Sequence, residues 1–391
     1  MRWPIVELSS IAEVKLGRQR SPQHHAGPTM RNYLRAANVG WSGLILDDVK
    51  QMNFTDDEMK TFRLEPGDVL LNEASGSAKE VGKPALWNGE IEDCAFQNTL
   101  LRVRSYSEAD PKYLLHFFRQ QAVSGEFARG SRGVGIHHLG RDALSKWRIP
   151  LPPCEEQRRI ATILDYVETM RCNLSEAAAA VDEASSSASA RFFEQQDPAQ
   201  RYPLETVAER VVVGHVGPTS KHFTLDGIPF LRTGNVGDGS IVEDDLLRID
   251  REFHARLAKS QLQAGDVVVS RVIGDRIRSA IIPESLDGSN CANIIIIRPS
   301  LRIRPAIITS YLSLRETQHE LLGRRVGSAQ SVVNTGVLKS LLVPVPSREQ
   351  QDEFCQVLAA IGKLRAKINI QRRLLDELFA SLQFRAFSGQ L

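Results

Sequence analysis

The sequence predicts a mixed α/β chain in which two similar α/β domains are separated by a long antiparallel two-helix coiled coil with pseudo-two-fold symmetry. Two observations lead to this prediction. The second half of the chain repeats motifs of the first half, and each half ends in a segment with a heptad pattern of apolar residues. The expected boundaries are 1–152 for the first domain, 153–196 for the first long helix, 197–346 for the second domain, and 347–391 for the second long helix and C-terminal tail.

The internal repeat rests on three short motifs that recur in the same order at nearly the same distance. One such match could arise by chance, but three in order indicate a duplication. The matched segments are Leu34–Val39 with Leu231–Val236, Glu65–Leu70 with Gln263–Val268, and Pro150–Gln157 with Pro344–Gln351, at offsets of 197, 198 and 194 residues.

Length and composition are those of an ordinary globular protein with two domains. The chain has 391 residues, of which 42% are hydrophobic and 25% charged, and its formal net charge is only +2. This balance excludes a polycation that coats nucleic acid, but it allows a basic face. The five cysteines include no CxxC pair, so neither a zinc site nor a disulfide framework is predicted. No signal-peptide core opens the sequence and no apolar run could span a bilayer, which predicts a cytoplasmic protein without membrane contact.

Within each repeat the pattern predicts strands in the middle and helices at the ends. A glycine turn precedes the short apolar runs Asp68–Leu71 and Asp266–Val269, which are typical of buried strands. Pro111–Gln121 and Pro305–Leu314 are predicted helices that begin with proline in the first turn. Each domain is therefore predicted to be mixed α/β.

The segments after the two proline motifs have the three-and-four spacing of a coiled-coil seam. A single polar residue, Gln371, interrupts the second seam and is a candidate register marker. The alternative is that two unrelated amphipathic helices pack on their own domains. The seam residues predicted for the spacer are Ile160, Ile163, Val167, Met170, Leu174, Val181, Phe354, Val357, Ile361, Leu364, Ile368, Leu375, Leu378 and Leu382.

The order of the segments makes an antiparallel pairing of these helices the natural one, with one domain at each end. The first helix must leave the first domain and reach the second, and the second helix ends the chain. Thirty-odd helical residues make a strut of roughly 50 Å. Because one turn of B-DNA is about 34 Å, such a strut could hold two readers on separate sites of one duplex.

The candidate DNA-reading residues lie in loops rich in arginine, glycine and small polar residues. Arginine, asparagine, glutamine and serine can address base edges, and glycine allows a close approach of the backbone to phosphates. The alternative is that these are solvated loop charges, but their matching positions in both repeats favour DNA. The candidates are Arg35, Asn38, Lys79, Lys83, Arg132, His137, His138, Arg141, Arg232, Asn235, Arg271, Arg276, Arg278, Arg324, Arg325, Ser328, Gln330 and Asn334.

No catalytic constellation is predicted. Gly76–Pro84 resembles a P-loop, but its spacing is one residue too long and Pro84 replaces the hydroxyl that would hold magnesium. The Asn/Asp-Pro-Pro-aromatic motif expected of an adenine methyltransferase is missing from the sequence. His137 and His138 are adjacent and point apart on any regular element, so they predict no metal site. The chain is therefore expected to be non-catalytic, with no metal of its own.

One segment carries a family resemblance. Ile149–Ile160, in which Pro-Leu-Pro-Pro-Cys-Glu-Glu-Gln precedes a heptad helix, resembles the specificity subunit of a type I restriction-modification system. Leu374–Leu382 and the closing Arg385–Leu391 resemble that family too. The second copy, Pro344–Gln351, departs from the motif at Ser347, which stands where the first copy has a second proline. The resemblance extends over the whole chain in architecture, and the proline-Glu-Gln motif is its most specific part.

The resemblance implies two target-recognition domains that read the halves of a split double-stranded DNA sequence, with the paired helices fixing the gap. It also implies two copies of an adenine-N6 methyltransferase subunit docked on the helices and motor-nuclease restriction subunits that join this core. S-adenosylmethionine, ATP and magnesium would belong to those partners, and none is expected on this chain. Two other classes of function stay open: an interaction scaffold with duplicated heads that bind proteins, and a methyltransferase or nuclease with diverged motifs.

Overall fold

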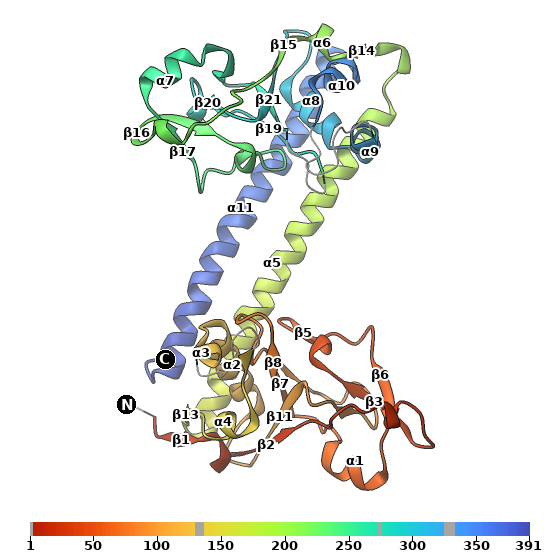
Figure 1. Cartoon of the computed structure of the whole chain (residues 1–391), viewed down its shortest axis with the longest axis vertical. Helices are drawn as coiled ribbons and strands as arrows, with labels where there is room; N and C mark the ends of the chain where they lie inside the picture. Colours follow the sequence, from red (N-terminus) through yellow and green to blue (C-terminus); the bar gives the residue numbers. More distant parts are fainter. Residues whose placement is uncertain (1–2, 130–136, 272–275, 324–332) are drawn as a thin grey trace. The chain divides into compact units, whose positions relative to one another are not determined.

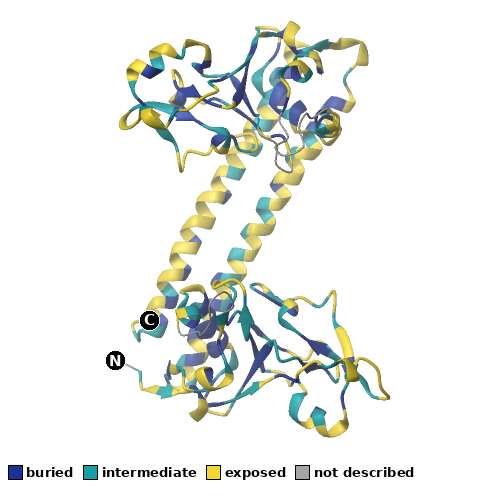
Figure 2. Ribbon diagram, viewed as in Figure 1, coloured by how far each residue is buried: buried dark blue, intermediate teal, exposed yellow. Residues whose placement is uncertain are grey.

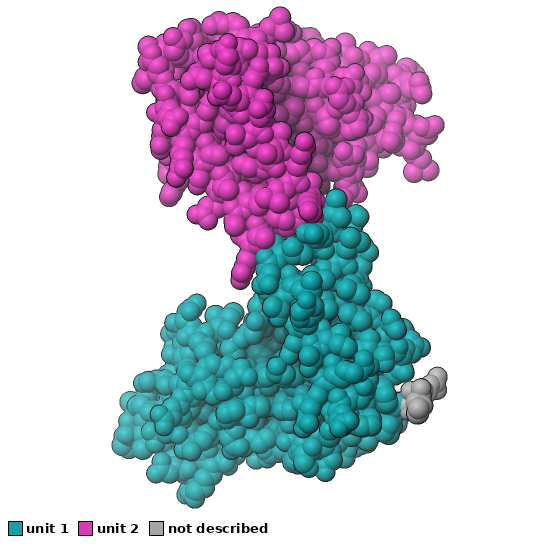
Figure 3. Space-filling view, turned by 180° about the vertical axis from the view of Figure 1, so that it is seen from behind, with its two compact units in different colours: residues 1–175, 370–391 teal, residues 176–369 magenta. Residues whose placement is uncertain are grey.

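The computed structural model describes residues 3–129, 137–271, 276–323 and 333–391, and it divides into two compact units. Unit 1 contains Met1–Ser175 together with Ile370–Leu391, and unit 2 contains Glu176–Asn369 (Figure 3). Each unit therefore contains one α/β domain and a part of each of the two longest helices, α5 and α11 (Figure 1).

Unit 1 is built on an antiparallel four-stranded sheet with the order β2-β11-β7-β9. A separate three-stranded sheet, β10-β3-β6, combines a parallel pair with an antiparallel pair, and β1 pairs with β13 just before the first long helix. The bounds are β1 Ile5–Glu7, β2 Ala12–Leu16, β3 Met30–Leu34, β6 Lys50–Asn53, β7 Val69–Asn72, β9 Pro84–Leu86, β10 Ala95–Phe96, β11 Leu100–Ser105 and β13 Arg148–Pro150.

Unit 2 has the same topology in the same chain order. Its four-stranded sheet is β15-β21-β18-β19, its three-stranded sheet is β17-β16-β20, and β14 pairs with β22. The duplication expected from the sequence is therefore confirmed at the level of strand order. The bounds are β14 Arg201–Pro203, β15 Ala208–Val213, β16 Phe223–Leu231, β17 Leu247–Ile249, β18 Val267–Ser270, β19 Ser279–Ile281, β20 Asn290–Cys291, β21 Ile294–Pro299 and β22 Leu342–Pro344.

Short helices and strands complete each unit. Proline at the first turn begins α2 and α8, as predicted, and the Asp110 side chain caps α2 by accepting from the backbone N–H of Lys112 at 3.0 Å. The helices are α1 Asp56–Phe62, α2 Pro111–Val123, α3 Glu126–Arg129, α4 Arg141–Ser145, α6 Leu204–Val207, α7 Arg251–Arg256, α8 Pro305–Ser313, α9 Arg315–Gly323 and α10 Thr335–Ser340, and the short strands of unit 1 are β4 Val39–Gly40, β5 Gly43–Leu44, β8 Ala74–Ser75 and β12 His137–His138.

The largest core of each unit lies between its four-stranded sheet and its helices (Figure 2). Val69 and Leu71 of β7 pack in one cluster with Phe117 of α2, and all three are buried. Val267 of β18 and Tyr311 of α8 lie in the corresponding cluster of unit 2. Full burial of an aliphatic or aromatic side chain stabilises by about 1.5–3 kcal/mol, so these two layers supply much of the stability of each domain.

The two long helices, α5 (Cys154–Glu194, 41 residues) and α11 (Arg348–Phe387, 40 residues), pair in antiparallel fashion within each unit. In unit 1, Leu164 near the start of α5 shares a buried cluster with Phe379 near the end of α11. In unit 2, Phe192 near the end of α5 stacks on Phe354 near the start of α11, with ring centroids 4.0 Å apart. The predicted antiparallel coiled coil is confirmed. No helix in the described parts of the chain is long and apolar enough to cross a membrane.

The seam of the coiled coil differs from the prediction in one of its two columns. Met170, Val357, Leu364 and Leu378 were predicted to face the partner helix, but they are 41%, 47%, 49% and 47% exposed. In the structure the residue one position later faces the partner helix in each case. The sequence spacing alone does not distinguish these two adjacent positions. Of the other predicted seam residues, Ile160, Val167, Val181, Phe354, Ile368 and Leu375 are buried, and Ile163, Leu174, Ile361 and Leu382 are half-buried.

The column of residues that faces the partner helix, one position after the predicted column, contains an arginine in each helix. Leu164 and Phe379 are its apolar members in unit 1. Arg171 of α5 donates from Nε to Asp376 of α11 at 2.7 Å, within unit 1. Arg365 of α11 pairs with Asp182 of α5 at 2.5 Å, within unit 2. These two arginines stand 194 residues apart, as do the two aspartates, so the ion pair is repeated. The predicted polar seam residue, Gln371, is exposed instead.

Candidate nucleic-acid interface

A buried glutamine explains the repeated proline motif. Gln157 is fully buried in the first turn of α5. Its Oε1 accepts from the backbone N–H of Asp110 at 2.8 Å, and its Nε2 donates to the carbonyl oxygens of Glu108 and Pro152 at 2.9 and 2.8 Å. The side chain thereby satisfies three backbone groups and ties the start of the long helix to the start of α2.

Gln351 repeats this arrangement in unit 2. Its Oε1 accepts from the backbone N–H of Arg304 at 2.7 Å, and its Nε2 donates to the carbonyl oxygens of Arg302 and Pro346, both at 3.0 Å. Gln351 is 1% exposed, and it lies in the first turn of α11 as Gln157 lies in the first turn of α5. The motif that carries the family resemblance therefore has a structural role: it fixes the direction in which each long helix leaves its domain.

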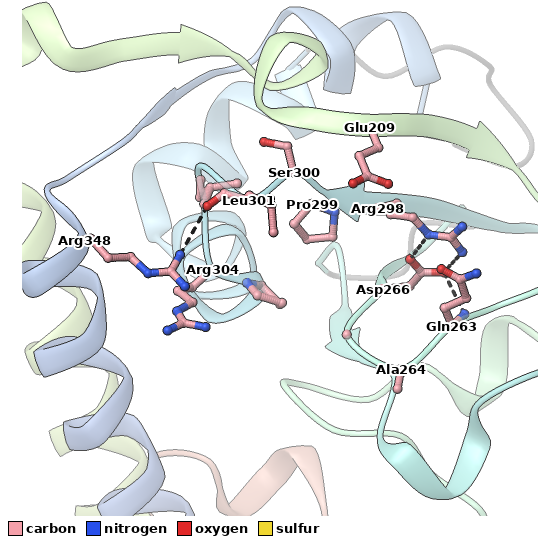
Figure 4. A pocket seen from close by; sticks show the side chains of 13 residues that line it. Glu209, Gln263, Ala264, Asp266, Arg298, Pro299, Ser300, Leu301, Arg304 and Arg348 are labelled. Atoms are coloured by element: carbon pink, nitrogen blue, oxygen red, sulfur yellow. Dashed lines mark hydrogen bonds and ion pairs between the residues drawn. The ribbon is translucent and has the colours of Figure 1, made fainter.

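A buried aspartate explains the second repeated motif. Asp266 is 1% exposed and accepts two hydrogen bonds of 2.8 Å from the Arg298 guanidinium (Figure 4). Its Oδ2 also accepts from the backbone N–H of Gln263 at 2.9 Å. Asp68 does the same in unit 1, with bonds of 2.7 and 2.8 Å from Arg104. Bidentate Arg–carboxylate pairs are strong and directional, so this pair fixes the turn before β7 and β18.

The cleft next to Asp266 belongs to this scaffold. It has a volume of about 310 Å³ and is lined by residues that include Gln263–Asp266, Arg298–Leu301, Arg304 and Arg348 (Figure 4). Those arginines are already engaged, because Arg304 pairs with Asp352 at 2.7 Å and Arg348 donates to the carbonyl oxygen of Leu301 at 3.2 Å. A ligand would have to break these contacts, so we assign the cleft no ligand.

The third repeated motif corrects two of the predicted DNA contacts. Asn38 and Asn235 are 2% and 3% exposed, so neither side chain reaches the surface. Asn38 accepts from the backbone N–H of Arg35 at 3.1 Å and donates to the carbonyl oxygen of Ile45 at 2.8 Å. Asn235 makes the equivalent bond to the carbonyl oxygen of Val242 at 2.9 Å. Both residues hold a loop closed from inside, which is why their type and spacing repeat.

Arg35 and Arg232 lie at the start of these loops and pair with a carboxylate at their end. Arg35 Nη2 donates to Asp48 at 2.7 Å, and Arg232 Nη2 donates to Asp245 at 2.8 Å. The Asp48 carboxylate also accepts from Lys50, and this bond and the nearby positive charges lower its pKa below the usual value. The arginine side chains keep part of their surface in solvent, so they stay available to a phosphate.

The loops of unit 1 meet at one end of its four-stranded sheet, where β2 and β7 end and β11 begins. We call this surface the loop face of unit 1; β8 marks its position in Figure 1. The backbone N–H of Gln97 donates to the carbonyl oxygen of Leu34 at 2.9 Å, that of Glu73 to Thr99 at 3.0 Å, and that of Leu139 to Glu73 at 2.8 Å. These bonds join residues 17–18, 34–38, 73–75, 97–99 and 137–139 into one surface.

Unit 2 has a matching loop face where β15 and β18 end and β21 begins. The backbone N–H of Ala292 donates to Leu231 at 3.0 Å, that of Asn293 to His215 at 3.0 Å, and that of Val333 to Arg271 at 2.9 Å. The face comprises residues 214–215, 231–235, 270–271, 292–293 and 333. A cleft of about 460 Å³ opens beside it and is lined by residues that include Thr219, Arg232 and Asn293.

Four further predicted residues of unit 1, besides Arg35 and Asn38, lie on or beside its loop face. His137 and His138 form β12, which pairs with β8, and His138 Nδ1 lies 3.2 Å from Glu73 Oε2. Because the ionised carboxylate can only accept, His138 Nδ1–H is the donor. Lys79 is exposed on the loop that follows β8, and Arg141 is exposed beside Asp142 at 2.9 Å.

The structure differs from the predicted DNA contact at Lys83, because the side chain of this residue supports the loop from inside. Only 13% of that side chain is exposed, and its Nζ pairs with the carboxylate of Glu80. Trp41 Nε1 donates to the same carboxylate at 3.1 Å. The hydrogen bond from Lys83 lowers the pKa of Glu80, against the opposing effect of burial. The P-loop-like segment is therefore an anchored surface loop, and Lys83 would have to leave Glu80 to contact DNA.

In unit 2 the predicted residues take different positions. Arg271 is half-buried on the loop face, and Arg276 is exposed and pairs with Asp238. Arg278 is exposed. Asn334 caps α10 by accepting from a backbone N–H at 2.8 Å, and it is exposed as well. Arg132, Arg324, Arg325, Ser328 and Gln330 lie outside the described residues.

The prediction missed Glu73 and the pair Asn98 and Asn293 on the two loop faces. Glu73 is acidic, whereas basic and amide side chains are the ones expected to contact DNA. The backbone N–H of Asn98 donates to Arg18 at 3.0 Å, as that of Asn293 does to His215. These asparagines stand 195 residues apart, so a fourth repeated motif could have found them. Among the described residues there is no cluster of three or more His, Cys, Asp or Glu side chains that could hold a metal ion.

Comparison with known proteins adds an independent result. Residues 2–179 match the family model of the type I restriction modification DNA specificity domain. The specificity subunit of the type I restriction enzyme EcoBI from Escherichia coli is 24% identical over 344 residues, which cover 79% of this chain and 70% of that protein.

Two solved structures have the same fold at low sequence identity. A chain from a type I restriction-modification system, studied for its complex assembly and conformational transition, has a TM-score of 0.60 at 17% identity, covering 100% of this chain and 98% of that one. The S subunit from M. genitalium has a TM-score of 0.58 at 12% identity, covering 99% and 96%. In its two matching domains and paired long helices the chain is similar to the specificity subunits of type I restriction-modification systems, and its residues 2–179 match their specificity domain.

Proposed function

We propose that this chain reads the two halves of a bipartite DNA sequence, one half with the loop face of each unit. The observation that carries the proposal is that one loop face is built twice on matching strands while its side chains differ. Two identical faces would read two copies of one half-site, whereas different faces read different ones. Arginine, lysine, histidine and asparagine on these faces suit contacts with base edges and phosphates.

The paired helices would set the gap between the half-sites. The glutamine in the first turn of each helix supports this role because it fixes the start of that helix, and the repeated ion pairs support it because they join the two helices. Inserting one or two helical turns into both α5 and α11 should change the gap without changing either half-site. A rise of about 5.4 Å per turn should lengthen the gap by one to two base pairs for each inserted turn.

The exposed apolar residues of α11 support a protein-docking role for the helices. Ile370, Leu374 and Leu378 are exposed at a spacing of four residues, which places them on one helical stripe. A contiguous exposed apolar stripe favours an interface with another protein. We assign it to two copies of an adenine-N6 methyltransferase subunit, with motor-nuclease restriction subunits joining that core in the cytoplasm. S-adenosylmethionine, ATP and magnesium would be bound by those partners, and this chain would supply recognition without catalysis.

The decisive experiment maps N6-methyladenine in the genome of the host strain with and without this gene. The proposal expects a split motif, two short half-sites separated by a gap of unspecified bases, that disappears when the gene is deleted. A continuous motif, or one that is unchanged by the deletion, contradicts the proposal. Purified chain that methylates or cuts DNA by itself would instead establish the diverged-enzyme alternative.

The docking role is tested by substituting glutamate on the exposed stripe. Leu374→Glu should abolish co-purification of the methyltransferase subunit, because it buries a charge in an apolar interface. Leu225→Glu is the matched control, since Leu225 is a fully exposed leucine on β16, far from both long helices in the sequence. Equal retention of the methyltransferase by both variants would exclude the stripe as its docking surface.

The scaffold alternative makes a different prediction for the loop faces. If the duplicated heads bind proteins, reversing the charges of Arg271, Arg276 and Arg278 should leave duplex binding by the assembled complex intact. If they bind DNA, the triple reversal should weaken binding and reduce its dependence on salt, because phosphate contacts release counterions. Fluorescence anisotropy with a labelled duplex at several salt concentrations distinguishes the two.

A further inference from the structure

One position on the loop face carries opposite charge in the two units. Glu73 and Arg271 each directly follow the buried strand that precedes the loop face, β7 or β18. The carbonyl oxygen of Glu73 accepts from the backbone N–H of Leu139 at 2.8 Å, and that of Arg271 accepts from Val333 at 2.9 Å. The backbone therefore assigns Glu73 and Arg271 to the same place in the fold, 198 residues apart.

In unit 1 the residue at this position is Glu73, whose carboxylate oxygens accept hydrogen bonds. Only 17% of the Glu73 side chain is exposed, and both carboxylate oxygens lie 3.2–3.3 Å from Nδ1 of His138. The His138 Nδ1–H donates to the carboxylate and so restrains the Glu73 side chain. The pair thus offers acceptors from a nearly fixed side chain, at little cost in conformational entropy.

A carboxylate on a DNA-binding face is informative because phosphates repel it. It is tolerated where it faces base edges, and there it accepts from an exocyclic amino group, N4 of cytosine or N6 of adenine. Arginine at the equivalent position has the opposite preference, since its guanidinium donates two hydrogen bonds to O6 and N7 of guanine. The same backbone position would then read an amino group in one half-site and guanine in the other.

We propose that Glu73, oriented by His138, and Arg271 are equivalent base-reading residues, the first selecting a base with an exocyclic amino group and the second selecting guanine. This inference rests on the proposed function. It adds that one position determines part of the specificity of both units, and that the two units differ in charge at that position.

The test uses the complete complex in the host, with N6-methyladenine mapping as the readout. Glu73→Ala should relax the preference at one base position of one half-site by roughly tenfold to a hundredfold, because a good base contact contributes that much discrimination. Arg271→Ala should do the same at one position of the other half-site. His138→Ala should weaken the Glu73 preference at the same base position, without moving it to another.

Matched controls come from the two-stranded sheets of each unit. Glu7 of β1 and Arg201 of β14 are exposed residues of the same types outside the loop faces, and their substitution by alanine should leave the motif unchanged. The half-site read by the unmutated unit is an internal control for folding, because a misfolded chain would lose both halves.

The possible outcomes distinguish a failure of the proposed function from a failure of this inference alone. A wild-type motif that is not bipartite defeats the proposed function itself. A bipartite motif that stays the same in Glu73→Ala and Arg271→Ala overturns only this inference. So does a uniform loss of methylation at every site with the motif unchanged, since that is the signature of a phosphate contact or of a structural role.

Discussion

Unit 1 and unit 2 make the same contact with the first turn of each long helix, but they make different contacts farther along it. At the start of each helix the same buried glutamine satisfies three backbone groups. About two turns later the two units diverge. In unit 1, Lys112 and His116 of α2 contact Asp165 of α5 at 2.8 and 2.7 Å. In unit 2, Ser310 and Ala359 stand 194 residues after His116 and Asp165.

This difference separates what the fold requires from what one copy tolerates. The glutamine is itself buried and occupies a place where the same three backbone groups need partners in either copy of the domain, so both copies have it. The charged contact between α2 and α5 is absent from the same place in unit 2, so the fold does not need it. The opposite charges of Glu73 and Arg271 follow the same logic on the loop faces, where the backbone is kept and the side chain is free to change.

The largest effect is expected at the aromatic residues that end each long helix. Phe193 lies 5.2 Å from Tyr311 between ring centroids, and Phe387, 194 residues later, lies 5.3 Å from Phe117. Phe193→Ala should destabilise unit 2 by about 4 kcal/mol, because it leaves a cavity in a buried site. Phe387→Ala should destabilise unit 1 by about 2 kcal/mol, since Phe387 is only partly buried.

Calorimetry of the purified chain measures both, as downward shifts of the melting transitions by roughly 2–4 °C per kcal/mol. Phe384→Ala is the control, because Phe384 is 63% exposed on the same helix and should shift the transition little. A larger effect of Phe387→Ala than of Phe193→Ala would contradict the burial argument.

The repeated glutamines should give equal effects in the two units. Gln157→Ala and Gln351→Ala each remove three hydrogen bonds, one from a backbone N–H and two to carbonyl oxygens, which should destabilise by about 3 kcal/mol at roughly 1 kcal/mol for each bond. Denaturant unfolding of each variant gives the free energy, and Gln356→Ala serves as an exposed control on α11. A marked difference between the two losses would show that the repeated contact has different weight in the two copies.

The charged contact between α2 and α5 predicts a pH dependence in unit 1 alone. Burial raises the pKa of the Asp165 carboxyl, but the hydrogen bonds from His116 and Lys112 outweigh it and lower the pKa to about 2, from 3.8. A depressed carboxyl pKa stabilises the folded state above the unfolded value, and this contribution is lost as pH falls through the folded value. It is about 1 kcal/mol here, because a third of the side chain is exposed and solvent screens it.

Stability measured from pH 7 down to pH 2 tests this expectation against Asp165→Asn. The advantage of the wild type over the variant should be constant above about pH 5 and decrease steadily below pH 4. Unit 2 offers the comparison, since Ala359 stands at the equivalent position and no such acid-sensitive contribution is expected there. An advantage that grew as the pH fell would have the wrong sign for a depressed pKa.

The sequence was sufficient for the architecture because duplication and heptad spacing are long-range patterns. Three motif matches and two apolar periodicities predicted the repeated domains and the antiparallel helices, and neither depends on the placement of any one side chain. The prediction of the seam was wrong where two adjacent residues fit the heptad spacing equally well. Ile163 and Leu164 are adjacent and both apolar, and only the packing against Phe379 and α2 shows that Leu164 faces inward.

The candidate site was harder to predict because polar residue type does not distinguish a surface contact from an internal one. Asn38 has the type and spacing expected of a base-reading residue, but it is buried and holds its own loop. Lys83 is basic and lies in a glycine-rich segment, but its charge is satisfied by Glu80. Repetition itself was the missing criterion: a polar residue repeated at a fixed offset is expected to be structural, whereas one that differs between copies is free to specify.

The smallest effects are expected at the repeated ion pairs between α5 and α11, where the two units differ by one aromatic contact. Arg171 and Arg365 each pair with an aspartate of the other helix, but only in unit 1 does an aromatic ring lie under the guanidinium, at 4.8 Å to the Phe379 centroid. Ser185 stands 194 residues before Phe379. Partly exposed ion pairs contribute about 0.2–1 kcal/mol, and a cation–π contact adds about 0.5–1 kcal/mol.

Arg171→Ala should therefore destabilise the chain by roughly twice as much as Arg365→Ala. The double exchange Arg171→Asp with Asp376→Arg restores the ion pair but moves the cation away from the ring, so it should recover only the ion-pair part of the loss. The same exchange at Asp182 and Arg365 should recover nearly all of its loss, because no ring is involved there. Double-mutant cycles on both pairs measure these differences directly. Equal recovery at the two sites would mean that the aromatic ring contributes nothing and that the two ion pairs are energetically alike.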